Sequence, residues 1–284
     1  MRVGLGISLL AIGLSLLLGI RHASAGSLIE FPNVSEQAPK LVGYLARPDR
    51  GLPALLGGRG GRSNADQYPA VVVLHGCSGI SSHSAEIADR LGSWGYVALA
   101  VDTLGPRGVA DRCTRSGYQD QAFDAYAALR YLAQQFFVDA TRIAVLGQSM
   151  GGIATLYAVD RDMAAQYFTE RFRAAIAYYP ACVLPKVSLT APTLILTGES
   201  DDWTPAERCR EMVAQARPDS APIALHVYPD AHHAFDVAAL QPARRAFGHL
   251  VEYNEPAAKD AEEKTRAFLA AHLAGTSPAV GNMR

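Results

Sequence analysis

The sequence carries almost no net charge. Its 284 residues include 26 lysines and arginines against 27 aspartates and glutamates, which gives a formal charge of −1. Proteins that bind nucleic acid or anionic membranes through a global field need a basic excess or a basic patch. The composition therefore excludes such a field and favours a small ligand that is recognised locally.

The sequence also lacks internal repeats, heptads and linker-like stretches, while 49% hydrophobic residues suffice for one sizeable core. Its histidines show no spacing typical of a metal site, so we expect neither a metal nor another cofactor. The glycine-rich segment 57–62 precedes an apolar run and lacks the Lys-Ser/Thr ending of a phosphate-binding loop. It predicts a hairpin connection instead.

Only the N-terminus carries a long hydrophobic run. It covers residues 3–20 and is followed by Ala-Ser-Ala ending at residue 25, an order typical of a cleaved signal peptide. An uncleaved anchor is the alternative, since a membrane span needs about 20 residues. We expect a signal peptide over residues 1–25 and a single domain over residues 26–284. The mature protein would be periplasmic or secreted, without stable membrane insertion.

Apolar runs alternate with amphipathic patterns along the rest of the chain. Strands are predicted over residues 28–31, 41–45, 70–74, 96–101, 142–146, 174–178, 193–196 and 223–228. Helices are predicted over residues 84–94, 119–135, 152–160, 206–216 and 257–272. This alternation is typical of a mostly parallel α/β sheet flanked by helices, with an antiparallel edge at its start. Such sheets bind ligands at the carboxyl ends of their strands.

Cysteine is scarce, with only Cys77, Cys113, Cys182 and Cys209. An even number in an exported chain is typical of disulfides, and four cysteines allow three pairings. We favour Cys77 with Cys113 and Cys182 with Cys209, which would tie loops on the same side of the sheet. Four buried thiols that pack as small hydrophobic residues are the alternative.

A Gly-x-Ser-x-Gly motif, with Ser149 at its centre, follows the strand predicted over residues 142–146 and precedes a helical pattern. In this context the motif is typical of a nucleophile elbow, where the glycines leave room for a strained turn that exposes the serine hydroxyl. Such a serine needs a histidine base and an orienting carboxylate, in the chain order Ser, acid, His. Asp201 or Asp202 follows the next suitable strand, and His232 or His233 the one after it; physical chemistry alone leaves both choices open.

Together these motifs resemble the dienelactone hydrolase family of α/β hydrolases over roughly residues 41–272. The family pattern Gly-x-x-Asp-x-x-x-Pro matches residues 198–205, which implies Asp201 as the acid. Its pattern of a histidine between small residues, then Phe, implies His233 as the base. Dienelactone hydrolases proper use a cysteine nucleophile, whereas Ser149 resembles the serine-containing, esterase-like relatives. The resemblance implies an α/β-hydrolase fold without implying activity on dienelactone.

An oxyanion hole in this fold is made by two backbone N–H groups. Met150, directly after the nucleophile, supplies the first. The sequence His-Gly-Cys-Ser-Gly over residues 75–79 resembles the oxyanion sequence of lidless esterases, so we expect Cys77 to supply the second. Cys77 as a nucleophile is the weaker alternative because it has no elbow, and His75 is better explained as a residue that shapes the loop.

Substrate contacts are less sharply marked. Only residues 179–192 separate two predicted strands at the place where related hydrolases insert a cap, so no cap domain is expected. Arg107, in a loop with Arg112 and Arg115, could bind a substrate carboxylate or simply face solvent. The aromatic side chains of Trp203, Tyr178 and Tyr179 could line an apolar pocket or belong to the core.

These expectations combine into an exported serine hydrolase that cleaves a small ester through an acyl-enzyme. A peptidase or an acyltransferase could use the same triad. A binding protein without activity is a third alternative, and the presence of all three triad residue types counts against it.

Overall fold

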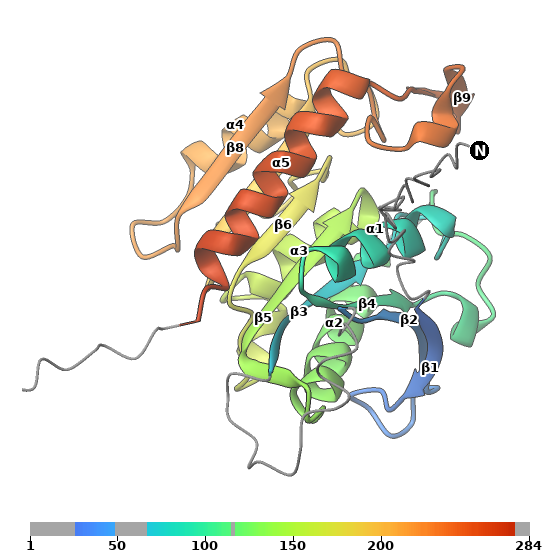
Figure 1. Cartoon of the computed structure of the whole chain (residues 1–284). Coiled ribbons are helices and arrows are strands. Elements are labelled where there is room, and N and C mark those ends of the chain that lie inside the picture. The colour runs from blue at the N-terminus through green and yellow to red at the C-terminus, as the bar shows by residue number, and fades with distance from the viewer. Residues whose placement is uncertain (1–25, 49–66, 115–116, 276–284) are drawn as a thin grey trace, which may run out of the picture.

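The structure is a computed structural model that describes residues 26–48, 67–114 and 117–275 (Figure 1). Its centre is an eight-stranded sheet in the order β1-β2-β4-β3-β5-β6-β7-β8. The strands are β1 (Ser27–Phe31), β2 (Leu41–Ala46), β3 (Tyr68–Leu74), β4 (Val97–Asp102), β5 (Val138–Gln148), β6 (Ala175–Tyr178), β7 (Thr193–Gly198) and β8 (Ile223–Tyr228). Strand β2 pairs antiparallel with β1 and β4, and the remaining pairs are parallel. The predicted mixed sheet with an antiparallel beginning is confirmed.

Five α-helices of the described residues cover the two faces of this sheet. One face carries α1 (Ser82–Ser93) and α5 (Glu255–His272), and the other carries α2 (Tyr118–Ala133), α3 (Met150–Val159) and α4 (Ala206–Ala214). Side chains of a strand alternate between the two layers. In β3, for example, Val73 packs in the layer of α1 and α5, and Val72 in the layer of α2 and α3. Both faces are therefore buried, as the continuous apolar runs of the central strands require.

The structure adds short elements that the sequence did not predict, and some of them lie beside the site. Between β8 and α5 lie a short 3₁₀ helix, η5 (Ala238–Leu240), and a hairpin of β9 (Arg244–Ala246) and β10 (His249–Val251). The hairpin turns through Phe247 and Gly248, whose φ angles are 51° and 92°. Residues 179–192, between β6 and β7, contain no helix, in agreement with the absence of a cap there.

Two sequence predictions fall on other parts of the chain. The signal peptide of residues 1–25 and the glycine-rich segment 57–62 lie outside the described residues. Within the described ranges, no helix combines the length and apolar character that crossing a bilayer requires.

Candidate active site

Ser149 lies in a sharp turn between the end of β5 and the start of α3. Its φ and ψ of 52° and −117° belong to a strained region that costs a non-glycine residue on the order of 1–3 kcal/mol. A Cβ at Gly147 would overlap the carbonyl of Gly151, and one at Gly151 would overlap the carbonyl of Leu74. The N–H of Ser149 donates to the carbonyl of Tyr178 at 2.9 Å. The two glycines thus permit the turn, and the neighbouring strand helps to hold it.

His233 and Asp201 form a hydrogen-bonded line with this serine. Ser149 Oγ lies 2.9 Å from His233 Nε2, and Asp201 Oδ2 lies 2.8 Å from His233 Nδ1. The side chain of Asp201 is fully buried and that of His233 is 4% exposed. This order of groups suits a serine whose proton can pass to an imidazole that a carboxylate orients.

Asp201 is surrounded by donors. The backbone N–H groups of Trp203 and Thr204 donate to Oδ1 at 2.9 and 2.8 Å, and the hydroxyl of Thr204 lies 2.7 Å from Oδ2. Burial by itself would raise the pKa of Asp201, but the hydrogen bonds and charge of His233 and the bonds from Thr204 outweigh it, so this pKa lies below its ordinary value. The group is therefore a carboxylate. Sequence reasoning missed Thr204, although its position three residues after Asp201 is typical of a local side-chain cap.

Asp202 and His232, the alternative acid and base that the sequence left open, have partners other than Ser149. Asp202 is half exposed and lies 3.4 Å from His249 of the hairpin. His232 lies 3.9 Å from the carboxylate of Glu252. The structure therefore brings the predicted pair, Asp201 and His233, to Ser149.

The loop after β3 lies against the serine turn. A Cβ at Gly76 would stand 3.7 Å from the Cβ of Ser149, and Cys77, the next residue, lines the same cavity as Ser149. His75 is buried in this loop; its Nδ1 lies 2.7 Å from the carbonyl of Gly76, and its Nε2 accepts from the N–H of Thr103 at 3.1 Å. Burial lowers the pKa of His75, so a neutral ring shapes the loop, as expected.

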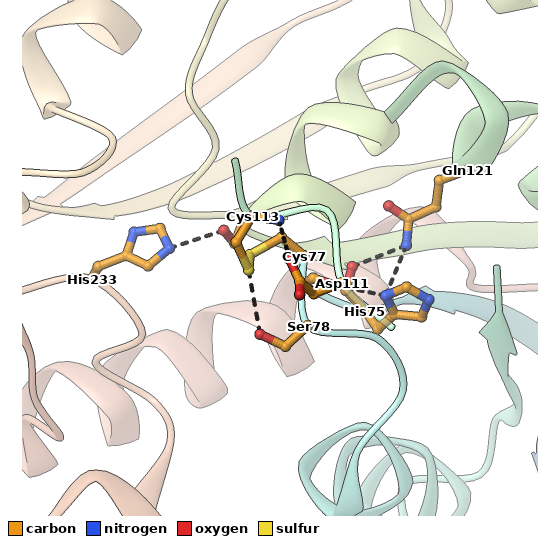
Figure 2. Close-up of a disulfide and its surroundings, with 9 residues drawn as sticks. His75, Cys77, Ser78, Asp111, Cys113, Gln121 and His233 are labelled. Atoms are coloured by element: carbon orange, nitrogen blue, oxygen red, sulfur yellow. Dashed lines mark hydrogen bonds between the residues drawn. A yellow bond between two sulfur atoms is a disulfide. The ribbon is translucent and has the colours of Figure 1, made fainter. Parts of the chain in front are cut away.

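Both preferred cysteine pairs are disulfides in the structure. Cys77 is bonded to Cys113, and Cys182 to Cys209. Figure 2 shows the first bond with His233 on one side and the hydrogen-bonded pair of His75 and Gln121 on the other. The carbonyl of Cys77 also accepts from the N–H of Arg112 at 2.8 Å. The loop that carries the Cys77 amide is thus tied covalently and by hydrogen bonds to the segment after β4.

A cavity of about 440 Å³ opens over Ser149 and His233. One wall is mainly apolar and comes from Trp203, the loop after His233 and the hairpin: Trp203, Ala234, Val237, Leu240, Phe247 and Val251. The polar part of the lining comes from the start of α1 and the end of β5: Ser81, Ser82, His83, Ser84, Glu86 and Gln148. The cavity therefore suits a ligand with one apolar part, placed next to the hydroxyl of Ser149.

Trp203 lines the cavity, which is one of the two places that the sequence left open. Its ring lies 4.9 Å from that of His233 and is stacked at 4.9 Å on His249, while Phe247 lies 5.8 Å away. The hairpin was missed because its residues, apart from the turn glycine Gly248, show neither strand alternation nor a continuous apolar run.

The prediction that Arg107 contacts substrate is wrong. Its guanidinium donates to both carboxylate oxygens of Asp124 at 2.8 Å and to the carbonyl of Thr103 at 2.7 Å, and it does not line the cavity. A guanidinium held in this bidentate way supports α2 rather than a substrate. Arg112 pairs with Asp120 at 3.4 Å, and Arg115 lies outside the described residues.

The prediction that Tyr178 contacts substrate is also wrong. It is the last residue of β6, its ring packs in the core beneath α5, and its hydroxyl lies 2.7 Å from Thr265 Oγ1. Tyr179, one residue later and in a left-handed conformation with φ of 37°, lines the cavity instead. Of these two tyrosines, only Tyr179 lines the cavity over Ser149.

Comparison with known sequences identifies the family of the chain. The sequence profile of the dienelactone hydrolase family matches residues 56–273. The chain belongs to this family. It is a dienelactone hydrolase-like carboxylic ester hydrolase.

Relatives cover most of the chain. A Bradyrhizobium protein named "Probable 2-oxo-3-(5-oxofuran-2-ylidene)propanoate lactonase" is 26% identical over 269 residues, 87% of this chain and 96% of the relative. A dienelactone hydrolase-like promiscuous phosphotriesterase from metagenomic libraries superposes with a TM-score of 0.67 at 19% identity, over 87% of this chain and 99% of that structure. A thermophilic esterase of Thermogutta terrifontis with propionate bound superposes with a TM-score of 0.64 at 20% identity, over 90% of this chain and 98% of that structure. These structures confirm the α/β-hydrolase fold.

Proposed function

We propose that the chain is an exported serine esterase in which Ser149 attacks the carbonyl carbon of a carboxylic ester. His233 Nε2 takes the serine proton, the ester alkoxide leaves with that proton, and an acyl group remains on Ser149 Oγ. Water activated by the same histidine then releases the acid. The observation that carries this proposal is the hydrogen-bonded line from Ser149 through His233 to the buried carboxylate of Asp201.

The N–H groups of Cys77 and Met150 would stabilise the negative charge on the carbonyl oxygen in the tetrahedral intermediate. Met150 is the first residue of α3, so its N–H lies at the positive end of a helix. The disulfide to Cys113 limits the movement of the other donor's loop. Preorganised donors of this kind supply a large part of the rate in acyl transfer.

The substrate would be an ester with an apolar acyl or alcohol group. The wall formed by Trp203, Val237 and Phe247 offers contact to such a group, and the cavity opens to solvent without a cap between β6 and β7. We also propose that residues 1–25 are removed as a signal peptide and that residues 26–284 act as one domain outside the cytoplasm. The two disulfides support this location, because they persist in oxidising compartments.

The test is an ester panel assayed with the purified mature chain and its Ser149→Ala variant. Hydrolysis should be measurable for the wild type and should fall about 10⁴-fold or more in the variant, with an unchanged circular dichroism spectrum and thermal transition. A variant that keeps a substantial fraction of wild-type turnover would contradict the proposal.

A further inference from the structure

A second buried charged group lies next to the nucleophile turn. Asp236, three residues after His233, has a side chain that is 12% exposed. Its Oδ1 accepts from the hydroxyl of Tyr179 at 2.6 Å, and its Oδ2 accepts from Gln148 Nε2 at 2.6 Å. Gln148 directly precedes Ser149, and the ring of Tyr179 lies 4.8 Å from that of His233. One carboxylate therefore joins the nucleophile turn, the end of β6 and the loop of the base.

His83, in the first turn of α1, completes this group. Its Nε2 lies 3.2 Å from Asp236 Oδ2 and 2.8 Å from Gln148 Nε2. His83 and Gln148 both line the cavity over Ser149. None of these contacts belongs to the hydrogen-bonded line of Ser149, His233 and Asp201.

The short distance between the two nitrogens determines where the protons lie. A 180° rotation of the Gln148 amide would place its oxygen next to the Asp236 carboxylate, where two acceptors would repel each other. The amide nitrogen Nε2 therefore faces Asp236 and donates one hydrogen to it. The second amide hydrogen can reach His83 only if the ring Nε2 is unprotonated and accepts it. A proton on that ring nitrogen would set two donors against each other at 2.8 Å, and His83 would then compete with Gln148 for Asp236.

We propose that His83, Asp236 and Gln148 form a positioning unit that holds the Ser149 turn in its active geometry only while Nε2 of His83 carries no proton. Protonation would release the Gln148 amide from this arrangement and move it into the cavity that it lines, beside the hydroxyl of Ser149. The residues act through the nucleophile turn and do not touch the reacting atoms. This inference rests on the proposed esterase function.

The charged groups around His83 come from three segments. They are Glu86 and Arg90 of α1, Asp236 of the loop after β8, and Lys259 and Glu262 of α5; the end of β6 adds the neutral tyrosines Tyr178 and Tyr179. Arg90 is paired with Glu262 at 3.0 Å, and the Glu86 carboxylate lies 3.7 Å from His83 Nδ1. Burial would lower the pKa of His83, but the hydrogen bond and charge of Asp236 and the charge of Glu86 outweigh it and raise this pKa above the ordinary value.

Activity and stability should therefore respond to this proton in opposite ways. The active arrangement is present above the pKa of His83 and is lost as the pH falls through it. Because the same pKa is raised by folding, the proton stabilises the fold at low pH, and this stabilisation is lost as the pH rises through the folded-state value. A residue with a merely structural role would not produce these opposed trends.

The test compares pH profiles of kcat and KM, with 4-nitrophenyl acetate as substrate, for the wild type, His83→Gln, Asp236→Asn and His272→Gln. Gln at position 83 offers a neutral acceptor that does not titrate near neutral pH, and His272, near the end of α5, is the remote histidine control. In the wild type and H272Q, kcat/KM should fall more steeply toward acidic pH than in H83Q, because protonation of His83 adds to the loss. In H83Q the acidic limb should be shallower and lie at lower pH, and the gain in stability with falling pH should disappear.

Asp236→Asn sets an amide donor against Gln148 or Tyr179. It should lower kcat about 10- to 100-fold at every pH and change KM less, as a small misplacement of reacting groups does. Identical pH profiles of H83Q and the wild type would overturn the inference, whether or not D236N folds. Failure of the proposed esterase function would look different, because the wild type itself would then not hydrolyse esters.

Discussion

Replacing Cys77 and Cys113 together by alanine should reduce both stability and kcat. The bond closes a loop over a sequence separation of 36 residues, for which loop-closure entropy gives about 4 kcal/mol of stability. Alanine keeps the backbone N–H of residue 77, so any loss of kcat reports its position and not its removal. A loosened oxyanion donor should lower kcat about 10- to 100-fold, less than the 10²- to 10³-fold typical of complete loss.

The matched control is the Cys182→Ala, Cys209→Ala double variant. Its bond spans a separation of 27 residues and should contribute about 3.5 kcal/mol, nearly the same amount, but it ties the loop after β6 to α4. Urea unfolding gives the free energies, and steady-state kinetics on a short-chain ester give kcat and KM. The reasoning is refuted if the two double variants lose kcat equally, or if the first keeps wild-type kcat despite its lost stability.

Three further predictions concern other parts of the site. Asp201→Asn should lower kcat about 10⁴-fold, because an amide does not hold the imidazole in the required tautomer; unchanged kcat in a folded variant would contradict this. Since the pKa of Asp201 is lowered by folding, its stabilisation is complete above the unfolded-state pKa of about 4 and is lost as the pH falls through the folded value. Urea unfolding between about pH 5 and about pH 3 should therefore show a steeper loss of stability in the wild type than in D201N, and parallel curves would count against it. Phe247→Ala should raise KM about 5- to 30-fold for esters with a bulky apolar group and leave acetate esters unchanged, whereas an equal rise for both would exclude a contact specific to that group.

The core of the fold could be predicted because each buried strand has a continuous apolar sequence. Strand β8 matches its predicted bounds, and the other strands differ by a few residues at their ends. The largest difference is β5, which begins at Val138 rather than at residue 142. Its residues 139–141, which include Asp139 and Thr141, are half-buried or exposed and form no apolar run. Apolar periodicity cannot register such an extension.

Local motifs also sufficed for the arrangement of Ser149, Asp201 and His233, because each follows a strand and the ends of parallel strands meet at one edge. The residues that were assigned wrongly could have been assigned correctly only with knowledge of tertiary contacts. Whether Arg107 faces substrate or a buried carboxylate depends on Asp124, seventeen positions away on another element.

The apolar wall of the cavity escaped prediction for a related reason. The hairpin of β9 and β10 is short and its arginines are exposed, so no periodic pattern marks it. Contacts to another loop support it, through the stacking of His249 on Trp203 and the ion pair of His249 with Asp202. Segments that depend on such contacts carry little signal in their own sequence.

The most direct test of the esterase account is covalent labelling of the purified protein with a fluorophosphonate. The account predicts one adduct per chain, located by peptide mass spectrometry on Ser149, and no adduct in Ser149→Ala or in unfolded protein. Labelling should slow strongly in His233→Ala, since the base is then missing. An adduct on another residue, or equal labelling of the Ser149→Ala variant, would contradict it.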